Sequence, residues 1–143
     1  MKTIHVARLR PQAILPTRKH PEDAGLDLYA SETVTIPGQT FAIVPTGITV
    51  HIPGGFVGLL KPKGRSNHLL GAGVVDAGYQ GEILIKVANP TGQAITFQPG
   101  DAVGQLLILP IFTPAVEEVS MDQIHADPSQ RGGSGGIVDQ HQD

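Results

Sequence analysis

A glycine-rich segment in the middle of the chain combines a carboxylate with an aromatic ring. It reads Gly71-Ala-Gly-Val-Val-Asp-Ala-Gly-Tyr-Gln-Gly-Glu-Ile83, with four glycines in its first eleven residues. The apolar residues on both sides predict a β-hairpin with Asp76 at its rim, where an acid can orient or deprotonate a water molecule. The glycines would let a ligand lie against the main chain, and Tyr79 could pack on a sugar. The alternative is a glycine-rich hairpin whose aspartate has no chemical role.

A second carboxylate stands where a strand is expected. Asp27 lies between two leucines in the segment Asp23–Ala30, and Gly25 before it suits a bend or a close backbone approach. A turn aspartate that hydrogen-bonds its own backbone is the alternative to a functional role.

Two further segments carry polar groups that suit phosphate binding. Lys61-Pro-Lys-Gly-Arg-Ser-Asn67 places three cations around Gly64 and follows them with a hydroxyl. The forked guanidinium of Arg65 and the backbone amides near Gly64 could hold phosphates. The spacing of these residues is not that of a P-loop, and a solvated loop without a ligand is an equal alternative. Gln105 lies within the apolar run Gly100–Pro110, where a buried amide needs partners; a structural amide is the default interpretation.

The residue types give no support to a covalent nucleophile. The chain has no cysteine, which excludes a thiol nucleophile, a thiolate metal site and disulfides. Ser66 has His68 nearby, but no triad-like setting surrounds the pair. We therefore do not expect a Ser66–His68 catalytic pair.

These side chains must be positioned by short strands. In 143 residues, 18 glycines and 12 prolines accompany 40% hydrophobic residues, which argues against long helices and against disorder. Six aromatic residues and no tryptophan predict a core of Val, Ile, Leu and Ala. Regularly spaced strands without crossover helices predict an all-β antiparallel sandwich or barrel, with one helical turn around Ser120–His125. The expected strands are Thr3–Leu9, Leu26–Ala30, Thr33–Ile36, Phe41–Val50, Phe56–Leu60, Glu82–Ala88, Ala94–Phe97 and Val103–Leu109.

Charge and composition divide the chain near its end. Residues 117–143 carry six acids against one base, and residues 128–143 contain too little apolar material to order themselves. We expect a β domain at 1–127 and a flexible C-terminal tail at 128–143. The net charge of −3 gives no reason to expect nucleic acid as a partner, and the sequence has neither an 18-residue apolar run nor a signal-peptide pattern. The prediction is a cytoplasmic protein without membrane contact.

The order of the four segments resembles the trimeric dUTPase family, over about residues 4–127. The matching motifs are Ala24-Gly-Leu-Asp-Leu28, Gly64-Arg-Ser66, Gly73-Val-Val-Asp-Ala-Gly-Tyr-Gln-Gly-Glu82 and Gly100-Asp-Ala-Val-Gly-Gln105. The third is the best match, and the linear set is far more specific than any single motif. The resemblance implies a jelly-roll-like β-clip fold, a homotrimer with sites at subunit interfaces, and hydrolysis of dUTP to dUMP and pyrophosphate.

The resemblance also implies roles for individual residues. Asp76 would position the attacking water, Tyr79 would pack on the deoxyribose and exclude a 2′-hydroxyl, and Asp27 would hold Mg²⁺ through water. The main chain of the hairpin, at Gly73 and Val75, would read uracil. The residues implied in phosphate binding are Lys63, Arg65, Ser66, Gln105 and Arg131. A cationic cluster with hydrated Mg²⁺ suits a triphosphate, whose charge it neutralises, and one carboxylate suffices to orient water for in-line attack.

The chain departs from the family pattern in two places. Residues 67–70 run almost directly into the Asp76 segment, so a few residues of the family pattern are missing there. The tail keeps the Arg-Gly start of the family's fifth motif at Arg131, but Gly136 stands at the usual phenylalanine position and Ile137 follows it. Since stacking of an aromatic ring on a base contributes about 1–3 kcal/mol, we expect a weaker lid.

Three alternatives remain beside dUTP hydrolysis. A dCTP deaminase shares the fold, but its chemistry needs a glutamate seven residues after the hairpin aromatic, where this chain has Lys86. A catalytically weak or silent nucleotide-binding paralogue is disfavoured because Asp76, Arg65, Ser66 and Gln105 are all present. A related dNTP pyrophosphatase with another base preference would follow if the two departures alter base recognition.

Overall fold

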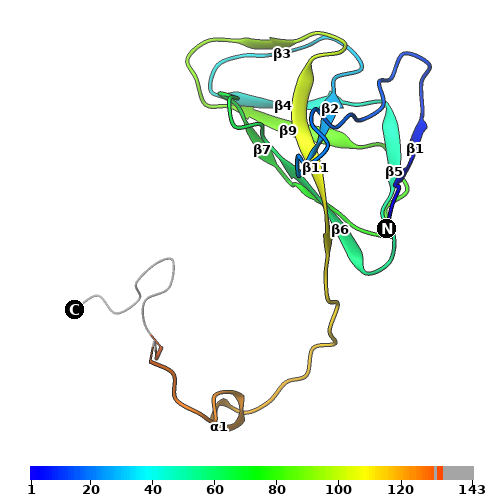
Figure 1. Ribbon diagram of the computed structural model, residues 1–143. Helices are drawn as coiled ribbons and strands as arrows, with labels where there is room; N and C mark the ends of the chain where they lie inside the picture. The colour runs from blue at the N-terminus through cyan, green and yellow to red at the C-terminus, as the bar shows by residue number, and fades with distance from the viewer. Residues whose placement is uncertain (131, 134–143) are drawn as a thin grey trace. The chain divides into compact units, whose positions relative to one another are not determined.

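The computed structural model describes residues 1–130, 132 and 133 (Figure 1). Its contacts divide the chain into one compact unit over Met1–Phe112 and a second that begins at Thr113. The predicted domain boundary after residue 127 stays a prediction. The elements are β1 (His5–Arg8), β2 (Leu26–Tyr29), β3 (Val34–Ile36), β4 (Thr40–Pro45), β5 (Ile48–His51), β6 (Phe56–Lys61), β7 (Leu69–Gly71), β8 (Val74–Val75), β9 (Leu84–Asn89), β10 (Ile95–Phe97), β11 (Ala102–Pro110) and α1 (Met121–Ile124).

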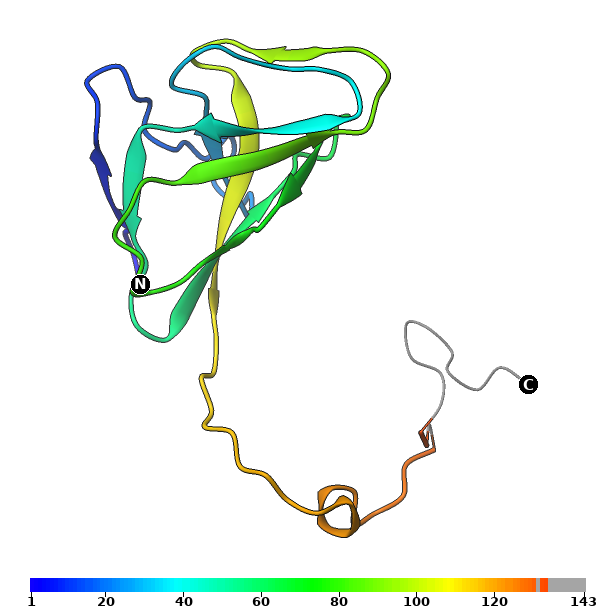
Figure 2. The ribbon, with the colours of Figure 1, turned by 180° about the vertical axis from the view of Figure 1, so that it is seen from behind.

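The first unit is an antiparallel β structure, which confirms the predicted fold class. A four-stranded sheet has the order β2-β11-β6-β8 and a three-stranded sheet the order β4-β9-β7, while β1 pairs with β5 and β3 with β10. Figures 1 and 2 show the strands from opposite sides. The core is built from branched aliphatic side chains, including Ile36, Val44 and Ile85 at 0% exposure. Phe97 is its one aromatic member among the described residues, as the composition predicts.

The predicted strand Phe41–Val50 is wrong as a single strand. It divides into β4 and β5, because Gly47 between them has a φ of 72°, a backbone conformation that glycine adopts without strain. A Cβ at this position would also lie 2.7 Å from the Cβ of Ala13. Gly47 therefore ends one strand and starts the next.

The predicted hairpin around Asp76 also differs from expectation. Its outer part forms, since β7 pairs with β9, but β8 next to Asp76 pairs with β6 of the other sheet. The chain passes between the sheets at Ala72, whose φ is 52°, and Gly73 then approaches β6 so closely that a Cβ would lie 2.5 Å from the Leu60 carbonyl oxygen. Asp76 consequently begins the loop of residues 76–83, which leads from β8 in the four-stranded sheet to β9 in the three-stranded sheet.

The second unit contains the predicted helical turn. The amides of Gln123 and Ile124 both donate to the Ser120 carbonyl at the start of α1. Large apolar side chains in and before this unit are exposed: Phe112 is 97% exposed, Val116 98% and Met121 81%. None of the described helices is long and apolar enough to cross a membrane.

Candidate active site

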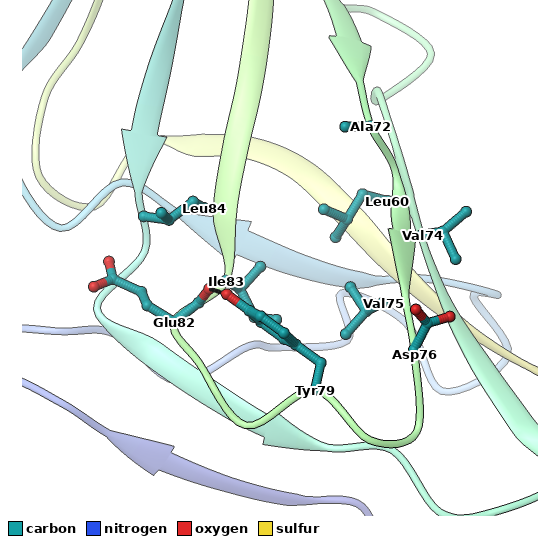
Figure 3. A pocket seen from close by; sticks show the side chains of 9 residues that line it. All are labelled: Leu60, Ala72, Val74, Val75, Asp76, Tyr79, Glu82, Ile83 and Leu84. Atoms are coloured by element: carbon teal, nitrogen blue, oxygen red, sulfur yellow. Dashed lines mark hydrogen bonds between the residues drawn. The ribbon is translucent and has the colours of Figure 1, made fainter.

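The Asp76 loop borders a cavity of about 180 Å³. Asp76, Tyr79 and Val75 line it together with Leu60, Ile83 and Glu82. Figure 3 shows the Tyr79 ring reaching across the loop toward Glu82 and Ile83, with Asp76 on the opposite arm. The structure therefore brings three of the predicted site residues to one partly apolar hollow with an exposed carboxylate at its edge.

The Tyr79 side chain is held by its own loop. Its amide donates to the Asp76 carbonyl at 3.1 Å, which closes a turn, and its hydroxyl donates to the Glu82 carbonyl at 2.5 Å. Gly81 makes room for the ring, because a Cβ there would lie 2.6 Å from the tyrosine hydroxyl oxygen. The ring thus spans the loop in a defined direction.

Glu82 and Arg10 form an ion pair that sequence reasoning missed. Arg10 Nη1 donates to Glu82 Oε1 at 2.9 Å and Nη2 to Oε2 at 2.7 Å, and the Gly47 amide donates to Oε2 at 3.0 Å. The hydrogen bonds from Arg10, opposed by burial and aided by the Gly47 amide, hold the pKa of the Glu82 carboxyl below its usual range. No local pattern signals the pair, because its partners lie 72 residues apart.

Loss of this ion pair should destabilise the fold in a pH-dependent way. We expect Glu82→Gln to lower the free energy of unfolding at neutral pH by about 1–2 kcal/mol, the low side for charged hydrogen bonds because Arg10 is partly exposed. The lowered folded pKa means that the carboxylate's contribution is complete above about pH 4.3 and disappears as the pH falls through the folded pKa. Urea unfolding of both proteins at equal concentration should show a constant difference at neutral pH that narrows in acid. A difference that grows in acid would contradict this assignment.

A second group of predicted residues surrounds Asp27. Its carboxylate is largely buried and pairs with Lys63, with 2.5 Å between Oδ1 and Nζ. Gln105 on β11 pairs with Asp27 of β2 on one side and with Lys61 of β6 on the other. Its Nε2 donates to the Pro62 carbonyl at 3.1 Å. Gly25 is required here, because a Cβ would lie 2.2 Å from the Gln105 Oε1. Asp27 is thus not a turn aspartate serving only its own backbone.

The loop after β6 carries the remaining cation and hydroxyl. The Ser66 amide donates to the Lys63 carbonyl at 3.0 Å, Arg65 is exposed, and a Cβ on Gly64 would meet no atom within 4 Å. His68 is buried. Its Nε2 lies 2.7 Å from the Val103 carbonyl oxygen, and its ring packs edge-on against Phe97. These contacts give His68 a structural role in the core of the fold.

The two groups lie at different levels of β6. Val75, next to Asp76, pairs with Gly58 near the start of β6, whereas Gln105 pairs with Lys61 at its end. Three residues of strand separate these levels, roughly 10 Å, and the chain continues to Asp76 and to Lys63 in opposite directions. One chain therefore does not bring Asp76 beside the Asp27 group. Arg131 lies outside the described residues.

Gly73 and Val75, whose main chain is predicted to contact uracil, have different surroundings. Val75 is buried and lines the Asp76 cavity. The Gly73 carbonyl accepts a hydrogen bond from the Leu60 amide at 2.7 Å. Gly73 thus joins the loop to β6, and Val75 contributes to the hollow itself.

Comparison with known proteins agrees with this architecture. Residues 11–136 match the dUTPase family. The chain is 40% identical over 142 residues to the deoxyuridine 5′-triphosphate nucleotidohydrolase of Mycolicibacterium gilvum, covering 93% of this chain and 92% of the relative. It is 36% identical over 141 residues to that of Mycobacterium tuberculosis strain H37Rv, with the same coverage.

Solved structures of similar fold lead to the same family. The Staphylococcus bacteriophage 80alpha dUTPase with dUpNHpp superposes with a TM-score of 0.86 at 28% identity, over 95% of this chain and 97% of that one. A mutant dUTPase from phage phi11 of S. aureus, described with a structural Mg(II) ion, gives 0.77 at 29% identity over 85% and 99%. With its antiparallel sheets, its Asp76–Tyr79 hollow and these matches, the chain belongs to the dUTPase family.

Proposed function

We propose that this dUTPase hydrolyses dUTP to dUMP and pyrophosphate with a water molecule that the Asp76 carboxylate orients. The observation that carries the proposal is that Asp76 and Tyr79 border the same cavity. Its apolar wall at Val75 and Ile83 suits a nucleoside, and the exposed carboxylate at its edge suits a water beside the triphosphate. Attack in line with the leaving pyrophosphate requires positioning and charge stabilisation rather than a covalent nucleophile.

The sugar and the phosphates would be held by separate groups. Tyr79 would pack on the deoxyribose, and the main chain around Gly73 and Val75 would read the uracil edge. The exposed Arg65 offers two parallel donors to a phosphate. The other groups proposed for the triphosphate are Lys63, Ser66, Gln105 and Arg131.

Asp27 fits a role in holding Mg²⁺ through water. Mg²⁺ is commonly bound by one or two carboxylates together with substrate phosphates, and it keeps several waters. Asp27 supplies one largely buried carboxylate, and its partner Lys63 is a flexible cation that could turn to a phosphate. When bound, the ion would neutralise charge that develops on the phosphate oxygens.

A homotrimer would unite the two groups of residues. Since Asp76 and the Asp27 group lie at different levels of β6, a complete site would combine the Asp76 loop of one copy with the Asp27 group of another. The exposed apolar residues Phe112, Val116 and Met121 support contact with a second copy. We assign the site to subunit interfaces on these grounds. A cytoplasmic location stays a prediction from the sequence.

Mixing two inactive variants tests the shared site. We expect Asp76→Asn and Arg65→Ala to be inactive alone, whereas a 1:1 mixture refolded together regains activity because about one site in four then combines native residues from two copies. Pyrophosphate release is the assay, and each variant refolded alone is the control. If the mixture stays inactive although mass measurement shows mixed oligomers, the site is not shared.

Deamination is disfavoured by the place of Lys86. This lysine lies on β9 with its Nζ 5.8 Å from the centre of the Phe41 ring, and it is exposed. It does not line the Asp76 cavity, so neither its charge nor its position suits a general acid or base at a pyrimidine amine.

A further inference from the structure

We propose that Arg10 and Glu82 are positioning residues that set the direction of Tyr79 and thereby the rejection of ribonucleotides. The inference rests on the proposed packing of Tyr79 against the deoxyribose. The Arg10–Glu82 ion pair borders the same cavity through Glu82, yet neither side chain has a part in binding or chemistry as proposed above. The pair instead determines where the Glu82 carbonyl lies.

Residues 82 and 83 are attached to the rest of the fold from several sides. The Glu82 carboxylate accepts from both Nη atoms of Arg10 and from the Gly47 amide. The Ile83 amide donates to the Ile48 carbonyl at 2.9 Å, and Thr46 Oγ1 donates to the Ile83 carbonyl at 2.6 Å. Leu9, the residue before Arg10, donates its amide hydrogen bond to the Gly47 carbonyl. The end of the Asp76 loop is therefore held against the β4–β5 turn.

This attachment reaches Tyr79 through one carbonyl. The tyrosine hydroxyl donates to the Glu82 carbonyl, and Gly81 leaves space for the ring beneath it. This is the only side-chain hydrogen bond that Tyr79 makes to the described residues. A shift of the Glu82 backbone would therefore shift or break it. A displaced ring no longer fills the space that a 2′-hydroxyl would need. The kcat/KM for UTP should therefore rise relative to that for dUTP.

The geometry requires a forked donor, not merely a positive charge. Two parallel hydrogen bonds of 2.9 and 2.7 Å join the guanidinium to the carboxylate, and a lysine ammonium cannot reproduce them. Arg10→Lys should consequently act in the same direction as Glu82→Gln, although it keeps the charge. Arg8 on β1 is exposed and has no side-chain bond to any described residue, so Arg8→Lys is a matched control.

The test is the ratio of kcat/KM for dUTP to that for UTP. We expect this ratio to fall about tenfold in Glu82→Gln and in Arg10→Lys, less than the roughly 10²-fold that a 1 Å misplacement of a reacting group can cost, because the Tyr79 ring is shifted and not removed. The ratio should stay unchanged in Arg8→Lys. Tyr79→Phe, which removes only the hydroxyl, should lower the ratio similarly. Adding Glu82→Gln to Tyr79→Phe should then lower the ratio little further. Both changes interrupt the same link between the Arg10–Glu82 pair and the Tyr79 hydroxyl, so their effects should not add.

The outcomes separate this inference from the proposed function. If Tyr79→Ala lowers the ratio while Arg10→Lys and Tyr79→Phe leave it unchanged, Tyr79 packs on the sugar as proposed but the positioning role is wrong. Additive losses in the double variant would also overturn it. If Tyr79→Ala leaves the ratio unchanged, the proposed sugar contact and the inference both fail. Circular dichroism at the assay temperature confirms that each variant is folded, and Tyr79→Phe tests the inference even where Glu82→Gln does not fold.

Discussion

Asp76→Asn will slow the hydrolysis of dUTP by about 10²–10⁴-fold, the range for loss of a general base. Asparagine has nearly the shape of aspartate, but its amide has no charge with which to orient or deprotonate a water. Asp76 is exposed at the edge of the cavity rather than part of the core, so the fold should be preserved. We expect dUTP to bind with nearly unchanged affinity, measured by titration calorimetry, while pyrophosphate release falls.

The control for this experiment is another exposed carboxylate. Glu22 lies in the loop before β2 and is exposed, so Glu22→Gln changes the net charge equally without touching the cavity. Its rate should equal that of the native protein. Equal rates for Asp76→Asn and the native protein would refute the role of Asp76, and a loss of dUTP binding would show that the carboxylate acts in binding instead.

Removal of residues 128–143 will lower kcat/KM for dUTP by at least about 10²-fold, the scale of a lost charge-stabilising group at a reacting phosphate. The physical reason is that Arg131 is proposed to bind the triphosphate, and the tail that carries it is expected to act as a lid over the site. The compact unit Met1–Phe112 lies entirely before the truncation, so circular dichroism should change little. Pyrophosphate release at several dUTP concentrations measures the effect.

A substitution in the opposite direction complements the truncation. Gly136→Phe restores the ring that the family's fifth motif carries at this place, and stacking on a base contributes about 1–3 kcal/mol. The variant should therefore bind dUTP more tightly than the native chain does. Unchanged turnover after truncation would exclude a lid, and unchanged affinity in Gly136→Phe would place the tail away from the base.

Local patterns were sufficient for several parts of this structure. Composition and regular spacing were enough to predict most strands, because short strands in a glycine- and proline-rich chain leave little else to form. The aromatic scarcity correctly predicted an aliphatic core. The order of four short motifs identified the family, and the comparisons confirmed it.

Local patterns failed where pairing between distant segments decided the outcome. β8 pairs with β6 rather than across the Asp76 loop, because Ala72 and Gly73 carry the chain to the other sheet. A sequence pattern reports the period of burial along one strand, but it does not report which neighbour that strand selects. The same holds for Gly47, where a Cβ would collide with Ala13, a residue from another part of the chain.

By itself, then, the sequence determined the class of fold, the family and the residues with chemical potential, since these depend on residue type and local spacing. Only the tertiary structure decided how they combine. It paired Asp27 with Lys63, joined Arg10 to Glu82 across 72 residues, and set Asp76 at one level of β6 and Gln105 at another. Each of these depends on strand register between segments far apart in the chain, because register determines which side chains face one another.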